Sequence, residues 1–216
     1  MNTDLDFPTD CGCLVRLTVS HVQDIRNLAY AAWEATYKTV LTPEQRAFDF
    51  EREYALPVLE AVIQSGEQVF YGAWHQAQLV GFLAVGYNAL TPETLWLHKF
   101  YLWPAYKGQG WGKRMLTAVQ QLAHHCVTET SPLKSLSLYV NRHNPAVRFY
   151  ERHQFTLVRS LDTCIGQDSQ GQPYFRNDYQ MEYTLAVASP WGKDNGLELG
   201  ACLAYNVSPP TETGAL

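Results

Sequence analysis

A glycine-rich turn between a strand-like segment and the clearest helical segment constrains the fold of this chain more than any other feature. Gly108, Gly110 and Gly112 follow the apolar run Leu95–Trp103 and open the segment Gly110–Val127. That segment carries apolar residues on one face, as an amphipathic helix does: Met115, Leu116, Val119, Leu122, Ala123 and Cys126. Glycines let the backbone approach a ligand closely, and a helix N-terminus attracts anions. The turn predicts a phosphate or pyrophosphate site, the alternative being a plain flexible connection.

The spacing of apolar residues predicts one mixed α/β domain over residues 14–185. The expected elements are a strand at 14–17, helices at 21–37 and 42–63, strands at 68–74, 79–87 and 95–103, a helix at 110–127, a strand at 136–140, a helix at 145–152, and strands at 155–161 and 179–185. The middle strands form hairpins, so we expect a central mixed β-sheet flanked by helices rather than a doubly wound sheet. After Ala186 the composition shifts to Gly, Pro, Ser, Thr and Asn, which indicates a C-terminal tail over 187–216.

Composition excludes several classes of protein. The chain has 216 residues with a net charge of -5, and it carries no Lys/Arg-rich run, so a nucleic-acid partner is not expected. The N-terminus lacks the apolar segment of a signal peptide, and no apolar run reaches the roughly 18 residues of a membrane span. The 5 cysteines are odd in number and scattered, as reduced thiols in a cytoplasmic protein would be. Cys11 and Cys13 have no second Cys/His pair at usable spacing, so we expect no metal.

The glycine turn does not fit the common nucleotide-binding motifs. A dinucleotide fingerprint requires G-x-G-x-x-G, whereas this turn reads G-x-G-x-G. A P-loop requires Ser or Thr after Gly-Lys, whereas Arg114 follows Gly112-Lys113 here. The run Lys107–Gly112 instead resembles the acetyl-CoA loop of the GNAT superfamily, where Arg or Gln is followed by two residues, a Gly, one residue, and Gly or Ala. Lys107 departs from that pattern: it keeps the positive charge but lacks the planar fork of Arg.

The strand that feeds the turn also resembles its GNAT counterpart. In that family the strand splays from its neighbour at a bulge, and its free backbone groups pair with the pantetheine arm of the cofactor like an added strand. The resemblance implies this role for the stretch that ends at Tyr101 and Leu102.

A second motif lies about 35 residues further along the chain. Leu138–Arg152 resembles the family's strand followed by an Asn-initiated helix that carries Phe-Tyr-Glu. Asn144 suits an N-cap, either as that alone or as a ligand contact. The resemblance gives Tyr150 the role of general acid for the departing thiolate, and the alternative is a half-buried Tyr with a satisfied hydroxyl. Gln154 departs from the family's Gly before Phe155.

The resemblance therefore implies an acetyl-CoA-dependent N-acetyltransferase with a GNAT-type fold. The implied contacts with the co-substrate come from the loop and the second motif: Tyr101, Leu102, Lys107, Gly108, Gln109, Gly110, Trp111, Gly112, Lys113 and Asn144. A base must accept the proton of the acceptor amine. His98, on the strand that feeds the turn, is one candidate, since imidazole titrates near neutral pH. Glu34 is the other, because the first two helices line the acceptor side in this fold.

The acceptor is less well defined than the cofactor. Two segments, 33–45 and 177–181, resemble the small-molecule polyamine/diamine branch of the family, so we favour such an amine. A protein N-terminus or lysine, an amino sugar and an antibiotic amine remain alternatives, as does a non-catalytic acetyl-CoA-binding module. The presence of Tyr150 favours an enzyme over such a module. The oligomeric state is open, with a homodimer among the alternatives.

The tail assignment predicts that residues 187–216 are dispensable. Their composition is typical of a linker, and they follow the last expected strand. A chain truncated after residue 186 should keep a cooperative melt and its full turnover, measured beside the intact chain. Aggregation, or loss of the cooperative melt, would show that Leu197–Val207 packs on the domain.

Overall fold

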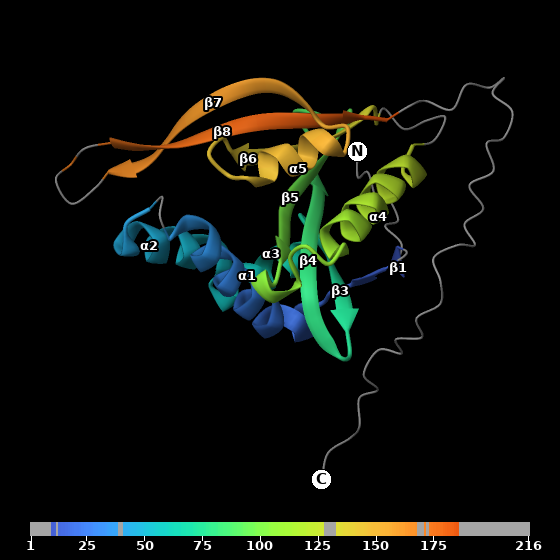
Figure 1. Ribbon diagram of the computed structural model, residues 1–216, viewed down its shortest axis with the longest axis horizontal. Coiled ribbons are helices and arrows are strands. Elements are labelled where there is room, and N and C mark those ends of the chain that lie inside the picture. The colour runs from blue at the N-terminus through green and yellow to red at the C-terminus, as the bar shows by residue number, and fades with distance from the viewer. Residues whose placement is uncertain are drawn as a thin grey trace, which may run out of the picture.

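The computed structural model describes residues 10, 11, 13–38, 41–127, 133–167, 171 and 173–185. A twisted sheet runs through the domain, with α1 (Val22–Tyr37), α2 (Pro43–Tyr54) and α3 (Leu56–Ser65) on one side and α4 (Trp111–His125) on the other (Figure 1). The expected tail, 187–216, lies outside the described residues. None of the described helices has both the length and the apolar character that crossing a membrane requires.

The sheet is mixed, as the hairpin pattern predicted. Its strands lie in the order β1-β2-β3-β4-β5-β6-β8-β7. They span Asp10–Cys11 (β1), Leu14–Arg16 (β2), Val69–His75 (β3), Gln78–Tyr87 (β4), Thr94–Leu102 (β5), Ser135–Asn141 (β6), Thr156–Gln167 (β7) and Pro173–Thr184 (β8). Among these strands β5 and β6 pair in parallel, and every other neighbouring pair is antiparallel. Short 3₁₀ turns, Val19–His21 (η1) and Pro104–Tyr106 (η2), precede α1 and α4, and α5 (Ala146–Arg152) follows β6.

Two hydrophobic cores lie on opposite faces of the sheet, because alternate residues of a strand face opposite ways. Leu83 and Val85 of β4 belong to the core that α4 and α5 cover. Phe82 and Ala84 of the same strand belong to the core that α1, α2 and α3 cover. The central strands are thus apolar on both faces, which explains their continuous hydrophobic runs.

The expected single helix over 42–63 is wrong, because it is two helices. Thr42 caps α2: its side-chain oxygen accepts a hydrogen bond from the Gln45 N–H at 3.2 Å. The chain then breaks at Ala55, whose ψ of 139° is extended. Pro57 explains the break, because a proline inside a continuous helix lacks the N–H to bond back and its ring clashes with the preceding turn. In the first turn of α3 the same residue is tolerated.

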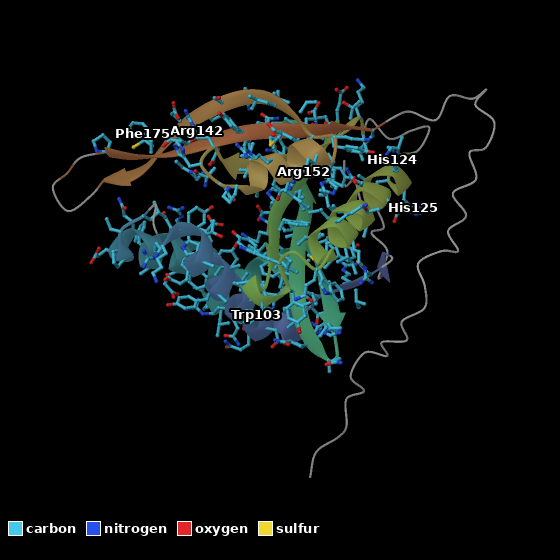
Figure 2. All side chains as sticks on the ribbon, viewed as in Figure 1. Trp103, His124, His125, Arg142, Arg152 and Phe175 are labelled. Carbon is cyan, nitrogen blue, oxygen red and sulfur yellow. The ribbon has the colours of Figure 1, made fainter. Side chains whose placement is uncertain are left out.

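The last two strands are longer than expected and form an arm that reaches beyond β6. β6 pairs with β8 from Asp178 to Thr184, whereas β7 pairs with β8 back to Pro173. Arg142, which follows β6, binds both strands of the arm. Its backbone N–H donates to the carbonyl of Asn177 in β8 at 2.9 Å, and its guanidinium pairs with Asp162 in β7. Arg142 and Phe175 both lie near the outer part of the hairpin, which extends past α2 (Figures 1 and 2). Arg176 and Asp178 of β8 lie in the lining of the cavity described below.

The β3–β4 hairpin turn predicts a stabilising substitution. Gln76 and Ala77 have φ of 48° and 61°, a left-handed conformation that costs L-residues free energy. Replacing this pair by Asn-Gly should raise the free energy of unfolding by about 1 kcal/mol, or Tm by roughly 2–4 °C. Ala35→Gly, at an exposed position of helix α1, is the control and should lower stability by about 1 kcal/mol. Equal destabilisation by both changes in urea titrations would contradict the strain argument.

Candidate active site

The site opens where two neighbouring strands stop pairing. The parallel ladder between β5 and β6 runs from Thr94–Ser135 to Leu97–Leu138 and ends there. Both strands continue, β5 to Leu102 and β6 to Asn141. Beyond the ladder they diverge, and a cavity of 790 Å³ lies along the gap, lined by β5, β6, β8, α1, α2, the glycine turn and α5. Backbone groups on the facing edge of β5 are therefore available to pair with an extended ligand.

A bulge in β5 stands at the start of this gap. Ala84 pairs with Lys99 and Val85 with Leu97, so His98 is the extra residue between them. Gly86 of β4 makes room for the His98 ring, since a Cβ at Gly86 would come within 3.1 Å of His98 Nε2. The splay and the bulge are the two features that the resemblance to GNAT proteins implied for this strand.

The glycine turn adopts the geometry that its sequence predicted. Gly108 and Gly110 have φ of 78° and 83°, and Gly110 is the N-cap residue of α4. A Cβ at either position would meet no heavy atom within 4 Å, so conformation, not crowding, favours glycine. Five residues of the turn line the cavity: Lys107, Gly108, Gly110, Gly112 and Lys113. Two lysines and a helix N-terminus thus face the same space, an arrangement suited to a pyrophosphate.

Gln109 and Trp111, which we expected to contact the co-substrate, do not line the cavity. The Gln109 amide donates to the Ala105 carbonyl at 2.8 Å, which closes the turn on η2. The Trp111 ring lies 5.8 Å from the His75 ring at the tip of the β3–β4 hairpin. These two side chains support the turn from outside, so any contact they make with a ligand would come from their backbone.

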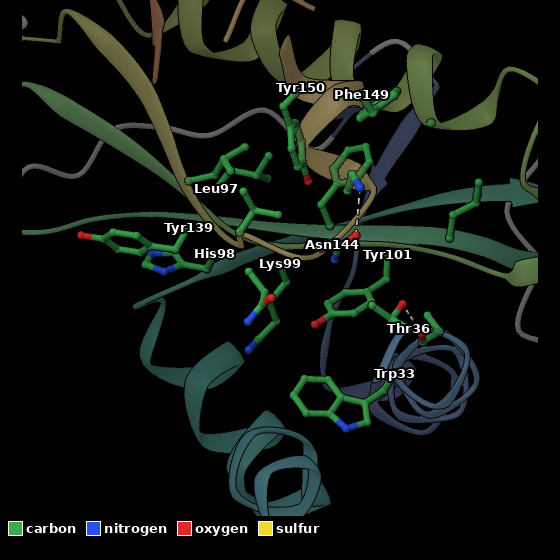
Figure 3. Close-up of a pocket in the computed structure, with 18 of the residues that line it drawn as sticks. Trp33, Thr36, Leu97, His98, Lys99, Tyr101, Tyr139, Asn144, Phe149 and Tyr150 are labelled. Atoms are coloured by element: carbon green, nitrogen blue, oxygen red, sulfur yellow. Dashed lines mark hydrogen bonds between the residues drawn. The ribbon is translucent and has the colours of Figure 1, made fainter. Parts of the chain in front are cut away.

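The helix after β6 places Asn144 and Tyr150 on the cavity wall (Figure 3). Asn144 Oδ1 accepts the Ala146 N–H at 2.9 Å, as a helix-initiating residue does, and the remaining amide N–H groups face the cavity. Tyr150 is 7% exposed, and its ring packs on Phe100 and Phe155. Its hydroxyl points into the cavity (Figure 3). Burial raises the pKa of Tyr150 well above its ordinary value, so the hydroxyl keeps its proton at neutral pH.

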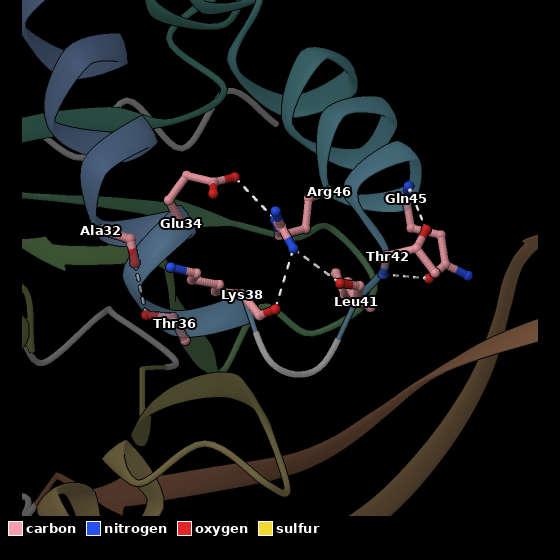
Figure 4. A network of polar contacts seen from close by, with 8 residues as sticks. All are labelled: Ala32, Glu34, Thr36, Lys38, Leu41, Thr42, Gln45 and Arg46. Atoms are coloured by element: carbon pink, nitrogen blue, oxygen red, sulfur yellow. Dashed lines mark hydrogen bonds and ion pairs between the residues drawn. The ribbon is translucent and has the colours of Figure 1, made fainter.

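The two candidate bases lie in different places. His98 lines the cavity, and the desolvation imposed by its neighbours, together with the Lys99 ammonium, lowers its pKa to about 4. The ring is therefore neutral at physiological pH. Glu34 lies outside the lining, where its carboxylate accepts from Arg46 Nε at 3.0 Å (Figure 4). Arg46 also donates to the Lys38 and Leu41 carbonyls, so Glu34 belongs to a network that joins α1 to α2.

The end of the cavity away from the glycine turn is aromatic and charged. Trp33, Tyr37 and Tyr54 project from α1 and α2 toward Tyr101 of β5, with 5.9 Å between the Tyr54 and Tyr101 rings. Charged residues from α2, β5 and β8 stand among them: Asp49, Arg52, Glu53, Lys99, Arg176 and Asp178. The sequence assigned none of these residues to the site, although Trp33, Tyr37 and Asp178 lie in the segments that resembled the polyamine branch. The residues come from distant segments, and only their shared position around the splay identifies them.

Comparison with known proteins agrees with this architecture. Residues 66–157 match the family model of the acetyltransferase (GNAT) domain. A spermine/spermidine N(1)-acetyltransferase of Bacillus subtilis is 34% identical over 101 residues, which cover 42% of this chain and 61% of that protein. The chain thus matches about three fifths of the length of this curated relative.

Solved structures show the same fold. PaiA N-acetyltransferase from Thermoplasma acidophilum, in complex with coenzyme A, has a TM-score of 0.60 at 23% identity, covering 79% of this chain and 97% of its own. A GCN5-related N-acetyltransferase from Rhodopseudomonas palustris has a TM-score of 0.63 at 16% identity, covering 82% of this chain and 97% of its own. The fold is therefore that of the GNAT proteins, as the glycine turn and the second motif predicted.

The geometry of the turn predicts the effect of a charge at Gly110. Gly110→Asp should lower the affinity for coenzyme A at least tenfold, roughly 1.4 kcal/mol, because it places a carboxylate at an anion site. Gly171→Asp is the matched control, since Gly171 also has a positive φ, 77°, and open space around it. Both variants carry similar backbone strain, so calorimetry should find weakened binding in Gly110→Asp alone. An equal affinity in the two folded variants would contradict the assignment of the turn.

Proposed function

We propose that this protein transfers an acetyl group from acetyl-CoA directly to an amine of a small diamine or polyamine. The observation that carries the proposal is the buried Tyr150 hydroxyl, which points into the same cavity that the glycine turn lines (Figure 3). The family match supports the reaction class. The Bacillus relative, named for spermine and spermidine, supports the acceptor class, and the coenzyme A complex of the Thermoplasma protein supports the co-substrate.

Different parts of the cavity would bind different parts of acetyl-CoA. The helix N-terminus at Gly110, with Lys107 and Lys113, would hold the pyrophosphate. The free edge of β5 up to Leu102 would pair with the pantetheine arm. Asn144 has amide N–H groups to donate toward the same arm. This arrangement brings the thioester between Tyr150 and the splayed strand.

The transfer then needs one proton acceptor and one proton donor. The amine nitrogen attacks the thioester carbonyl, whose oxygen is polarised by backbone N–H groups of the splayed strand near Leu102. His98, being neutral, accepts the amine proton directly or through water; we prefer it to Glu34, which Arg46 holds outside the cavity. The C–S bond breaks, and Tyr150 gives its proton to the departing thiolate. The products are an N-acetylated amine and coenzyme A.

This role for Tyr150 predicts a selective loss of turnover. Tyr150→Phe removes the hydroxyl and keeps the ring packing, so kcat should fall by roughly 10²–10⁴ while acetyl-CoA affinity and Tm change little. Tyr30→Phe, at a tyrosine that is 55% exposed on α1, serves as the control and should keep full activity. Release of free thiol from acetyl-CoA in the presence of diamines measures both.

Two results would overturn parts of the mechanism. Full turnover by Tyr150→Phe would remove this residue from the chemistry. A kinetically competent acetyl adduct, detected by mass spectrometry after mixing the protein with acetyl-CoA alone, would replace direct transfer by a covalent route. Absence of turnover with every amine, in a protein that binds coenzyme A, would favour a binding module over an enzyme.

A further inference from the structure

We infer that Glu53, Tyr54 and Gln68 form the subsite for the remote ammonium group of the acceptor, and that this ammonium displaces the amine of Lys99, which fills the subsite in the structure. The inference rests on the proposed function and deepens it, because it assigns the residues that distinguish a diamine from a monoamine.

Lys99 shows that this part of the cavity accepts an ammonium group. The Nζ of Lys99 lies 3.3 Å from Glu53 Oε2 and 4.7 Å from the centre of the Tyr54 ring. Lys99 is 8% exposed, although its amine is at the cavity wall. A carboxylate on one side and an aromatic face on the other are the groups that bind ammonium ligands in proteins. The Lys99 side chain thus occupies a position that suits an acceptor cation.

Glu53 differs from the other carboxylates of the cavity because its nearer cation is a lysine, with Lys99 at 3.3 Å and Arg52 at 3.7 Å. Among the described lining residues, carboxylates occur at Asp49, Glu53 and Asp178. Asp49 pairs with Arg52 at 3.1 Å, and Asp178 pairs with Arg176 at 2.5 Å. An arginine stays charged under all ordinary conditions, so a ligand cation on Asp49 or Asp178 would add a positive charge beside an arginine that cannot lose its own. A lysine can instead lose its proton, which makes Glu53 the carboxylate that a ligand can reach at low cost.

The surroundings of Lys99 favour this loss of a proton. Burial lowers the pKa of Lys99, and Glu53 opposes that shift. The groups that face Lys99 are Glu53 and Tyr54 from α2 and His98 from its own strand, with Arg52 3.7 Å from the other oxygen of Glu53. When a diammonium ligand places one charge on Glu53, Lys99 releases a proton to the solvent. The charge within the subsite is then unchanged, so no net charge is buried.

Gln68 provides a polar group that the protein itself leaves unsatisfied. Its Oε1 is buried and has no hydrogen-bond partner among the described residues, yet the residue lines the cavity. Gln68 precedes Val69, which pairs with Val85, so it lies near Gly86 and the adjoining His98 ring. A buried carbonyl oxygen without a donor costs free energy, and an N–H group of a bound ammonium would remove that cost. The oxygen is thus suited to a ligand donor at this subsite.

A matched pair of amines tests the assignment. The wild-type protein should acetylate 1,4-diaminobutane with a kcat/KM at least tenfold higher than 1-aminopentane, which has a methyl group in place of the remote ammonium. Gln68→Met and Glu53→Gln should reduce this preference to less than threefold, mainly through KM for the diamine. Glu51→Gln, on the same helix but paired with Arg26 outside the cavity, should keep the full preference.

A proton count separates displacement of Lys99 from simple addition of a ligand. The amines are titrated into the coenzyme A complex in two buffers of different ionisation enthalpy, so that released protons are counted without turnover. The diamine should release about one more proton than the monoamine from the wild-type protein, and the excess should vanish in Lys99→Met. Should that variant not fold, Lys99→Gln serves instead.

The outcomes distinguish this inference from the function on which it rests. Equal acetylation of both amines by the wild-type protein, or a preference that survives Gln68→Met and Glu53→Gln, overturns the subsite and leaves the acetyltransferase proposal standing. A diamine preference without the extra proton overturns the displacement of Lys99. No thiol release with either amine removes the proposed function, and the subsite with it.

Discussion

The whole site depends on the point at which β5 and β6 stop pairing. Four residue pairs form the parallel ladder, from Thr94–Ser135 to Leu97–Leu138, and the strands then separate. The separation creates a gap in the sheet but exposes neither hydrophobic core. Leu95 and Leu97, within the paired part of β5, remain buried. A continuous ladder would satisfy the backbone of β5 internally and close the space along which a cofactor arm could lie.

Electrostatics divides the resulting cavity into two unlike ends. The end at the glycine turn presents lysines and backbone N–H groups, with no carboxylate from the turn itself. At the other end each lining carboxylate that the structure describes is matched by a cation within 3.3 Å. Asp49, Lys99 and Asp178 are the buried members of these pairs, and a buried charge without a partner costs free energy. A cationic ligand at this end would therefore compete with a protein cation for one of these carboxylates.

The sequence predicted best those features of the site that depend on the conformation of a few consecutive residues. The sequence directly indicated the glycine turn at Gly108 and Gly110, and Asn144 just before α5, because positive φ and helix initiation leave a signature within a few residues. The bulge at His98 could not, since a bulge depends on the register of two strands. The pairing of Lys99 with Glu53 joins residues 46 positions apart and has no local signature. The break at Ala55 was missed for another reason: the apolar pattern continues across it, and only Pro57 marks it.

The two cores have an evolutionary consequence. The core under α4 and α5 supports the glycine turn and Tyr150, whereas the core under α1, α2 and α3 supports the opposite wall. The family match, residues 66–157, begins after α3, so it includes α4 and α5 and omits the three N-terminal helices. Under the proposed function, substitutions in α1 and α2, which line the cavity, would change acceptor recognition and leave the glycine turn and Tyr150 in place. A lineage with this architecture can thus diversify its substrates by changing one packing unit and inheriting the other.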